Sequence, residues 1–575
     1  MPRWLPLLFL AASLTVSGQS ARPDFKFHLR GGQLRTAEDY QKMIVTLPVA
    51  ADQAAVGQSP SPTGLPVTAE RLLKATAEPG NWLTYSGDYR SHHYSSLDQI
   101  TDANVHRLKA KWIFQMHRSK VETTPIVVDG VMYVTRPQSD VIALDAETGR
   151  ALWTYEHRLT GRVYVCCGEV NRGLAILGHT LFLTSLDAQL VALDARSGRV
   201  LWKKPLGDPA LNYTATGAPL AIKDKVIVGI AGAEGGIRGF LDAYDARTGE
   251  RVWRLWTVPA PGEPGSETWG GDSWRHGGAS TWLTGSYDPE LNLLYWGTGN
   301  PGPDYNGDVR PGDNLYSSSL LALDPDTGTL KWHFQFTPHD TRDWDATQIP
   351  VLIDSPTGRK LVVMPSRNGF HYVLDRKTGE FLLARPFVKQ TWAKEIDKKG
   401  RPVLNPGQEP TPDGNDSIWP GVDGGHNWMS PSYHPGTKLL YFNAREERRR
   451  FFKSDALEFR PGESFFGGGG GGGARFRPEE SWGKLVAMVP ETGEIRWEHR
   501  IAAPPWAGVL STAGNLVFSA TPSGNFYALD ARTGKELWHF NGGDRVFASP
   551  ITFLSRGKQV ITIPIGDMLI AFGVD

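Results

Sequence analysis

The two cysteines of this chain are adjacent, Cys166-Cys167, within the stretch Tyr-Val-Cys-Cys-Gly-Glu-Val-Asn-Arg-Gly. Two neighbouring thiols are most often a pair of small buried side chains. In an oxidising compartment they can also close a strained eight-membered ring that contains the peptide bond between them, and such strain is typical of functional sites. From the residues alone, a disulfide-closed ring and two free thiols are equally expected.

The cysteine count and the net charge exclude several kinds of chemistry. Two cysteines are too few for a four-cysteine zinc site, a cysteine-ligated iron–sulfur cluster or a disulfide framework. Because they are adjacent, they form no Cys-x-x-Cys-His motif for a covalently attached haem. The 61 basic and 61 acidic side chains cancel, which argues against nucleic acid as a partner, since binding phosphate needs a basic surface.

A repeated pattern indicates the elements that must position any site. It reads Ala-hydrophobe-Asp-x-x-Thr/Ser-Gly-x-x-x-Trp and predicts a hairpin in which Asp bonds the turn backbone and Gly takes a positive φ. Clear copies end at Trp153, Trp202, Trp253, Trp332 and Trp538, and degenerate copies end at Leu383 and Trp497, with Trp112 a candidate for one more.

The spacing of these copies, mostly ~40–50 residues, indicates a radial repeat. A four-stranded sheet cannot bury both faces alone, so such sheets stack around an axis with indole rings between them. We therefore predict an all-β fold, an eight-bladed β-propeller with Trp-docking motifs between blades, with seven blades as the fallback. Residues 546–574 are expected to complete one blade with strands from residues 82–112, which removes free sheet edges.

The remaining segments predict the domain boundaries. Arg3 and the 13 mostly apolar residues that follow it predict a signal peptide over 1–18 and a periplasmic or secreted protein. Residues 19–78 predict a poorly structured arm and 79–575 the propeller, in which 445–480, with seven consecutive glycines, is expected to be a flexible surface insertion. No later segment approaches the ~18 apolar residues of a membrane span.

Several stretches resemble the PQQ-dependent (quinoprotein) alcohol and methanol dehydrogenases. The resemblance rests on Cys-Cys followed by Val-Asn-Arg-Gly, on the Trp-closed repeats, and on VETTPIVVDGVMYV from Val121, WGGDSWRHGG from Trp269, DWDATQIPVL from Asp343 and HNWMSPSYHP from His426. It extends from about Asn81 to the end of the chain, apart from the glycine-rich insertion. The family's members are eight-bladed propellers that bind pyrroloquinoline quinone (PQQ) and calcium.

The resemblance also implies which residues form the site. Glu234, Asn300 and Asp345 match the metal ligands, and oxygen ligands suit a hard cation. Asp345 matches the catalytic base, with Asp343 as the alternative. Trp282 matches the indole on which the quinone stacks, with a ring of the two cysteines over its other face. The full set of implied cofactor contacts is Glu122, Cys166, Cys167, Arg172, Thr216, Gly232, Ala233, Trp282, Arg367, Asn427 and Trp506.

Two positions depart from the family pattern. Ala231 stands where several relatives carry a hydroxyl contact to the cofactor. Thr347, two residues after Asp345, is not the additional Asp that lanthanide-dependent relatives use. On this ground Ca²⁺ is favoured over a lanthanide.

The resemblance implies oxidation of a small alcohol to an aldehyde or ketone. Hydride passes to Ca²⁺-bound PQQ while Asp345 accepts the hydroxyl proton. The missing haem motif implies that a separate soluble cytochrome c accepts the electrons. A homodimer or a small second subunit stays open, as does the identity of the alcohol.

Two other interpretations remain at this stage. A non-catalytic exported propeller that binds or assembles other molecules would lack the combination of Cys-Cys, Glu234, Asn300 and Asp345. A degenerate family member that binds PQQ but turns over poorly is kept open by Ala231 and the insertion.

Overall fold

The structure is a computed structural model that describes residues 27–28, 34–35, 66–117, 120–161, 163–415, 417–455, 457–470 and 480–574. The chain divides into two units, residues 1–61 and 62–575. In the first unit the described part is one antiparallel pair, β1 (Phe27–His28) with β2 (Leu34–Arg35). The predicted signal peptide and most of the predicted arm lie outside the described residues.

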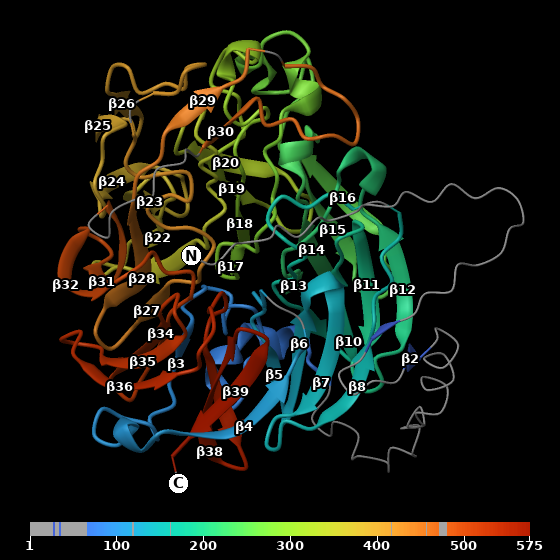
Figure 1. Cartoon of the computed structure of the whole chain (residues 1–575), viewed down its shortest axis with the longest axis vertical. Helices are drawn as coiled ribbons and strands as arrows, with labels where there is room; N and C mark the ends of the chain where they lie inside the picture. The colour runs from blue at the N-terminus through green and yellow to red at the C-terminus, as the bar shows by residue number, and fades with distance from the viewer. Residues whose placement is uncertain are drawn as a thin grey trace, which may run out of the picture. The chain divides into compact units, whose positions relative to one another are not determined.

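The second unit contains eight blades, of which seven are four-stranded sheets and one has a short fifth strand, and Figure 1 shows them arranged as a ring. The predicted eight-bladed propeller is therefore confirmed. The blades are β5–β8 (Ile126–Val128, Val131–Arg136, Asp140–Asp145, Ala151–Tyr155), β9–β12 (Ala175–Leu177, Thr180–Thr184, Gln189–Asp194, Val200–Pro205), β13–β16 (Leu220–Ile222, Lys225–Gly229, Phe240–Asp245, Arg251–Trp256), β17–β20 (Ser286–Asp288, Leu293–Gly297, Ser319–Leu323, Leu330–Gln335), β21–β24 (Val351–Asp354, Lys360–Pro365, Phe370–Asp375, Phe381–Pro386), β27, β28, β31 and β32 (Ser432–His434, Leu439–Glu447, Ser481–Val489, Glu494–Ile501), β33–β36 (Leu510–Thr512, Leu516–Ala520, Asn525–Asp530, Glu536–Asn541), and β37–β39 with β4 (Ile551–Ser555, Lys558–Ile565, Met568–Gly573, Lys109–Gln115).

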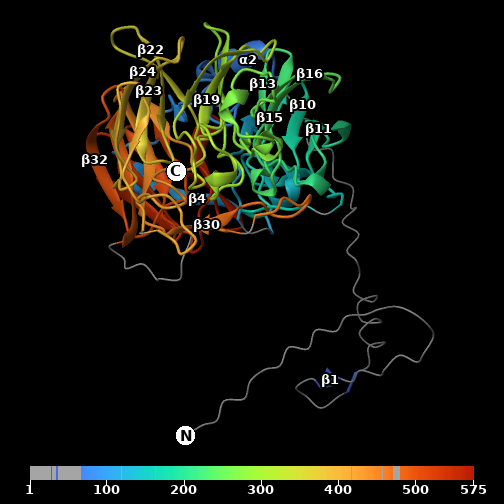
Figure 2. The ribbon, with the colours of Figure 1, turned by 90° about the horizontal axis from the view of Figure 1, so that it is seen from above.

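The other elements are short. β3 (Tyr94–Ser95) adds to the seventh blade parallel to β33, and two small hairpins pair β25 (Ala393–Ile396) with β26 (Pro402–Leu404) and β29 (Phe451–Lys453) with β30 (Gly468–Gly470). The helices are α2 (Ala69–Leu73) and the 3-10 turns η1 to η8 (Ala75–Ala77, Val105–Arg107, Pro137–Ser139, Pro209–Leu211, Ala233–Gly235, Ser266–Thr268, Ser273–His276, Gly307–Val309). In Figure 2, α2 and β30 lie on opposite faces of the ring. None of the helices among the described residues has the length and apolarity needed to cross a bilayer.

The ring closes between its first and last strands. β4 pairs antiparallel with β39, with Trp112 opposite Ala571, and the indole of Trp538 donates to the carbonyl of Leu108 at 3.2 Å. The sequence predicts that the last blade includes strands from Trp82 onward, and this is wrong for Trp82. Trp82 instead forms a single bridge with Val127 of the next blade, so β4 alone completes the last sheet.

The repeat tryptophans pack each blade against the next one. Trp153, on the outer strand β8, lies over Gly198, where an added Cβ would come within 2.5 Å of the ring, and its indole donates to the carbonyl of Ala195 at 3.2 Å. Only a glycine, at φ +69°, fits beneath that indole. Where Leu383 replaces the tryptophan, the groove between the fifth and sixth blades has a volume of about 390 Å³.

Two predicted boundaries need correction. Residues 67–77 are not part of a loose arm, because Val67 and Leu72 are buried against the first blades and Val67 donates to the carbonyl of Gly178 at 2.9 Å. The insertion over 445–480 begins only after Glu447, where β28 ends, and its described part is packed rather than loose. Its Phe451 is fully buried, because its aromatic ring fills space beside the fourth and fifth blades.

Candidate active site

Loops from several blades line one cavity of about 500 Å³. Glu234 and Asp345 line it. All the cofactor contacts implied by the resemblance except Ala233 line it as well, namely Glu122, Cys166, Cys167, Arg172, Thr216, Gly232, Trp282, Arg367, Asn427 and Trp506. Ala233 is buried beside Glu234 in η5, and Asn300 is buried next to Asp345. The fold therefore brings together residues that are more than 350 positions apart in the chain.

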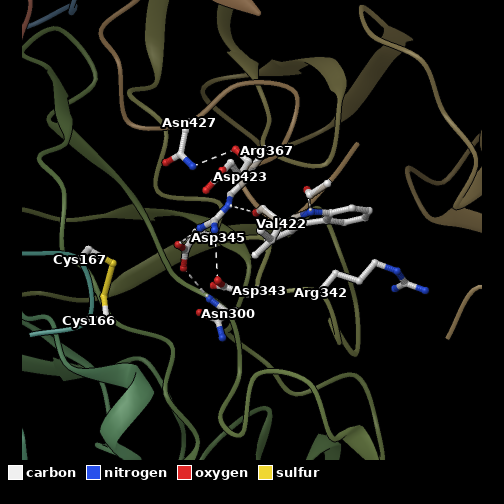
Figure 3. A network of polar contacts seen from close by, with 12 residues as sticks. Cys166, Cys167, Asn300, Arg342, Asp343, Asp345, Arg367, Val422, Asp423 and Asn427 are labelled. Atoms are coloured by element: carbon white, nitrogen blue, oxygen red, sulfur yellow. Dashed lines mark hydrogen bonds and ion pairs between the residues drawn. A yellow bond between two sulfur atoms is a disulfide. The ribbon is translucent and has the colours of Figure 1, made fainter. Parts of the chain in front are cut away.

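Cys166 and Cys167 form a disulfide bond, so the ring is present and the free-thiol alternative is not. Both residues are exposed and line the cavity, and Figure 3 shows them to one side of Asp343 and Asp345. The Lys120 ammonium donates to the carbonyl of Cys167. The disulfide is thus placed to cover a ligand that enters the cavity.

Arg172 lies among the aromatic side chains of the cavity. Its guanidinium is 4.8 Å from the ring centre of Trp282 and 5.4 Å from that of Trp428. It also pairs with Glu122 at 2.7 Å and donates to the hydroxyl of Thr216 at 2.8 Å. Burial raises the pKa of Glu122, although Arg172 opposes the shift. Flat aromatic surfaces with a planar guanidinium suit a flat aromatic ligand that carries carboxylates.

Arg367 links two carboxylates that line the cavity, Asp343 and Asp345 (Figure 3). Its Nη1 forms a close ion pair with Asp345, and its Nη2 donates to Asp343 Oδ2 at 3.2 Å. The other oxygen of Asp345 accepts the backbone N–H of Asn300 at 2.9 Å. The Arg367 Nε donates to the carbonyl of Val422 at 3.0 Å, which fixes the plane of the guanidinium.

Two further carboxylates, Glu234 and Asp304, complete the acidic cluster. Asp304 is fully buried, and neither of its oxygens accepts a hydrogen bond of ordinary geometry from a described residue. Burial raises the pKa of Asp304 well above its usual range, and the charges of Asp343, Glu234 and Asp345 add to the shift. Burial also raises the pKa of Asp343 in the same way, with Arg367 opposing. A bound cation would relieve this repulsion.

The loop that carries Glu234 needs glycine on its N-terminal side. Gly232 has φ +112°, and a Cβ there would lie 2.0 Å from the carbonyl oxygen of Asn212. Burial raises the pKa of Glu234, the charge of Asp345 adds to the shift and Arg367 opposes it. Carboxylate oxygens of Glu234 and Asp345 with the side chain of Asn300 are the oxygen donors that a hard cation prefers.

Sequence reasoning missed some residues of the cavity. Trp428, which lines the cavity, and the buried Asp304 of the acidic cluster could have been found, because they closely follow the implied residues Asn427 and Asn300. Lys120, Tyr164, Arg545 and Phe547 carry no local signal, since the curvature of the ring brings their loops to the cavity.

Comparison with known proteins agrees with the fold and with the family resemblance. The family model for the Glucose/ethanol/alcohol dehydrogenase, beta-propeller domain (PQQ) matches residues 82–386 and 477–561. The quinoprotein alcohol dehydrogenase PedH of Pseudomonas putida is 39% identical over 532 residues, 87% of this chain and 88% of that protein. The quinohemoprotein alcohol dehydrogenase of Comamonas testosteroni is 39% identical over 520 residues, 84% of this chain and 72% of that protein.

The solved structures similar to this chain include alcohol and methanol dehydrogenases. A europium-containing methanol dehydrogenase superposes with a TM-score of 0.82 at 33% identity, covering 88% of this chain and 100% of that chain. The chain belongs to the family of PQQ-dependent alcohol dehydrogenases. As a member of that family of enzymes it is not a non-catalytic binding propeller.

Proposed function

We propose that this protein oxidises a small alcohol to an aldehyde or ketone, with PQQ in the 500 Å³ cavity and a metal ion at the acidic cluster. When bound, PQQ supplies the acceptor for the hydride. The observation that carries the proposal is that one cavity joins Arg172, stacked at 4.8 Å on Trp282, to the carboxylates held by Arg367.

The residues present fit the cofactor. PQQ is flat and carries three carboxyl groups, and the cavity offers the indole of Trp282, the exposed disulfide and the guanidinium of Arg172. Nη2 of Arg172 is already paired with the carboxylate of Glu122, and the planar guanidinium can also pair with a carboxyl group of PQQ. Trp282, Trp428, Trp506 and Phe547 give the cavity aromatic walls, which would limit the access of water to a bound alcohol.

We assign the role of general base to Asp343. The sequence-based prediction of Asp345 stays a prediction, but both oxygens of Asp345 are engaged, by Arg367 and by Asn300. Asp343 lines the cavity, its side chain is 21% exposed, and no described residue donates to its Oδ1. A base needs an accessible lone pair, and Oδ1 of Asp343 offers one once the bound cation offsets the burial and the neighbouring charges that raise the pKa of this carboxyl.

The charge of the cluster bears on the metal. When ionised, Glu234, Asp304, Asp343 and Asp345 carry four negative charges against the single positive charge of Arg367. The net charge of the cluster is then three negative charges. A trivalent ion balances all three, whereas Ca²⁺ leaves one negative charge unbalanced. We propose that a lanthanide binds more tightly than Ca²⁺, although Thr347 alone favours calcium. The europium-containing methanol dehydrogenase shows that a structurally similar protein takes such an ion.

Two parts of the proposal concern the surroundings of the enzyme. PQQ that has accepted a hydride must return its electrons to an acceptor outside the cavity, and we propose that this acceptor is a separate soluble cytochrome c. The apolar stretch after Arg3 supports export to the periplasm.

The test is reconstitution of the purified protein with PQQ and either Ca²⁺ or La³⁺, followed by dye-linked oxidation of primary alcohols of increasing chain length. We expect turnover only with both PQQ and metal, with La³⁺ effective at lower concentration than Ca²⁺. Absence of turnover with every alcohol, together with absence of PQQ binding, would overturn the proposal.

A further inference from the structure

The glycine-rich insertion contacts the loops of the acidic cluster. It leaves the sixth blade after β28 and returns at β31. We call its described residues 449–455 and 457–470 the strap. The strap contains the β29–β30 hairpin, which Figure 1 shows beside the fourth and fifth blades, and no described residue of the strap lines the cavity.

The strap binds the backbone of the loop that carries Glu234. The N–H of Phe465 donates to the carbonyl oxygen of Glu234 at 2.6 Å. The ring of Phe459 stacks on His276, with 3.5 Å between ring centres and 20° between planes. Phe459 also covers Gly236, where an added Cβ would come within 2.8 Å of its ring. The end of the Glu234 loop is thus held from outside the cavity.

The strap also binds the loop that carries Asp304. The N–H of Tyr305 donates to the carbonyl of Phe466 at 3.0 Å, and the amide of Asn306 donates to the carbonyl of Ser454 at 3.0 Å. A Cβ on Gly467 would lie 2.9 Å from the Pro303 side chain. Glycine at this point lets the two backbones approach closely.

A third contact reaches the loop that carries Asp343 and Asp345. Phe451 is fully buried, and its ring centre is 6.4 Å from that of Trp344 and 6.3 Å from that of Tyr305. Trp344 lies between the two aspartates in the chain. One strap therefore touches three loops that supply the acidic cluster.

We propose that the strap is a positioning element that fixes the distances among the metal-binding carboxylates. The carboxylates repel one another before a cation binds, and their loops come from different blades. Holding the loops together in advance lowers the reorganisation that binding requires and so raises the affinity for the metal. Phe465 acts through Glu234 and touches no reacting group. The inference rests on the proposed metal site.

The test measures binding of Tb³⁺ alone to the full-length protein, by sensitised luminescence. Phe465→Ala and Phe465→Pro both remove the ring, but only proline removes the N–H. We expect Phe465→Pro to weaken Tb³⁺ binding about fivefold more than Phe465→Ala does, the loss of about one hydrogen bond. The control Glu463→Ala removes an exposed side chain of the strap and should bind Tb³⁺ as the wild type does.

Circular dichroism checks that each variant keeps the propeller. If Phe465→Pro fails to fold, Phe459→Ala replaces it, with an expected loss of about threefold or more from removal of the stack on His276. Folded variants that all bind Tb³⁺ within twofold of the wild type would overturn the strap proposal alone. A wild-type protein that binds no Tb³⁺ would instead overturn the metal site and the strap together.

Discussion

Arg367 forms an ion pair with Asp345, and this contact holds Asp345 while leaving one oxygen of the neighbouring Asp343 accessible. The two aspartates therefore have different surroundings although one residue separates them. We expect Asp343→Asn to lower kcat by about a thousandfold, since a general base contributes ~10²–10⁴, while leaving PQQ binding intact. Steady-state kinetics at saturating metal measure this.

The matched variant is Asp345→Asn. Because Asp345 is bound by Arg367 and Asn300, we expect this change to weaken metal binding first, with part of the turnover recovered at high metal concentration. Loss of turnover in Asp345→Asn with metal affinity unchanged would return the role of base to Asp345.

Arg172→Lys tests the recognition of the cofactor. Lysine keeps the charge but loses the planar fork and the stacking on Trp282. We expect PQQ affinity, followed by quenching of tryptophan fluorescence, to fall about tenfold, with metal affinity unchanged. Equal PQQ affinity in Arg172→Lys and the wild type would show that the fork is not used.

Leu383→Trp tests the packing between blades. Leu383 leaves a groove of about 390 Å³ at the position where other blades carry an indole, so filling it should raise the free energy of unfolding by about 0.5–2 kcal/mol. The reverse change, Trp332→Leu, should lower it by about 1–3 kcal/mol. Urea unfolding measures both, and a stabilised Trp332→Leu would contradict the account.

Three fully buried histidines predict a loss of stability in mild acid. Burial lowers the pKa of His93, His371 and His426 to about 4. Between pH 6.5 and 4 the unfolded chain binds protons at these rings and the folded chain does not, so unfolding becomes easier as the pH falls. Each ring contributes about 1.4 kcal/mol per pH unit in that window.

The measurement is the free energy of unfolding from pH 7 to pH 4.5 in the wild type and in His371→Asn. The variant loses one titrating ring, so its stability should depend less steeply on pH. An identical slope in both proteins would show that His371 does not titrate in this window. Above pH 7 neither form is protonated and the slopes should coincide.

Much of the fold could be predicted from sequence because the docking of each blade is local. Trp153 and Gly198 meet through adjacent repeats, so a repeated motif reports a repeated contact. The closing strand β4 was less predictable, because its pairing with β39 joins segments from the two ends of the ring. Trp82 lies near β4 in the sequence but pairs with Val127.

Part of the candidate site was predictable because its residues lie in motifs that resemble the family, not because of a repeated local contact. Asn300 and Asp345 lie in motifs that resemble the family, whereas Asp304 lies only a few residues from Asn300 and was missed. The strap was misjudged because runs of glycine favour flexibility in isolation. Here Gly467 and Gly468 instead permit contact with the loop of Tyr305, which only the folded arrangement reveals.

An anaerobic single-turnover experiment tests whether Asp343 accepts the hydroxyl proton of an alcohol whose hydride bound PQQ would accept. The protein loaded with PQQ and La³⁺ is mixed with excess ethanol, and the acetaldehyde is quantified. We expect one equivalent of acetaldehyde per bound PQQ in the wild type and a rate about a thousandfold lower in Asp343→Asn. No acetaldehyde from the loaded wild type, or an equal rate in Asp343→Asn, would contradict it.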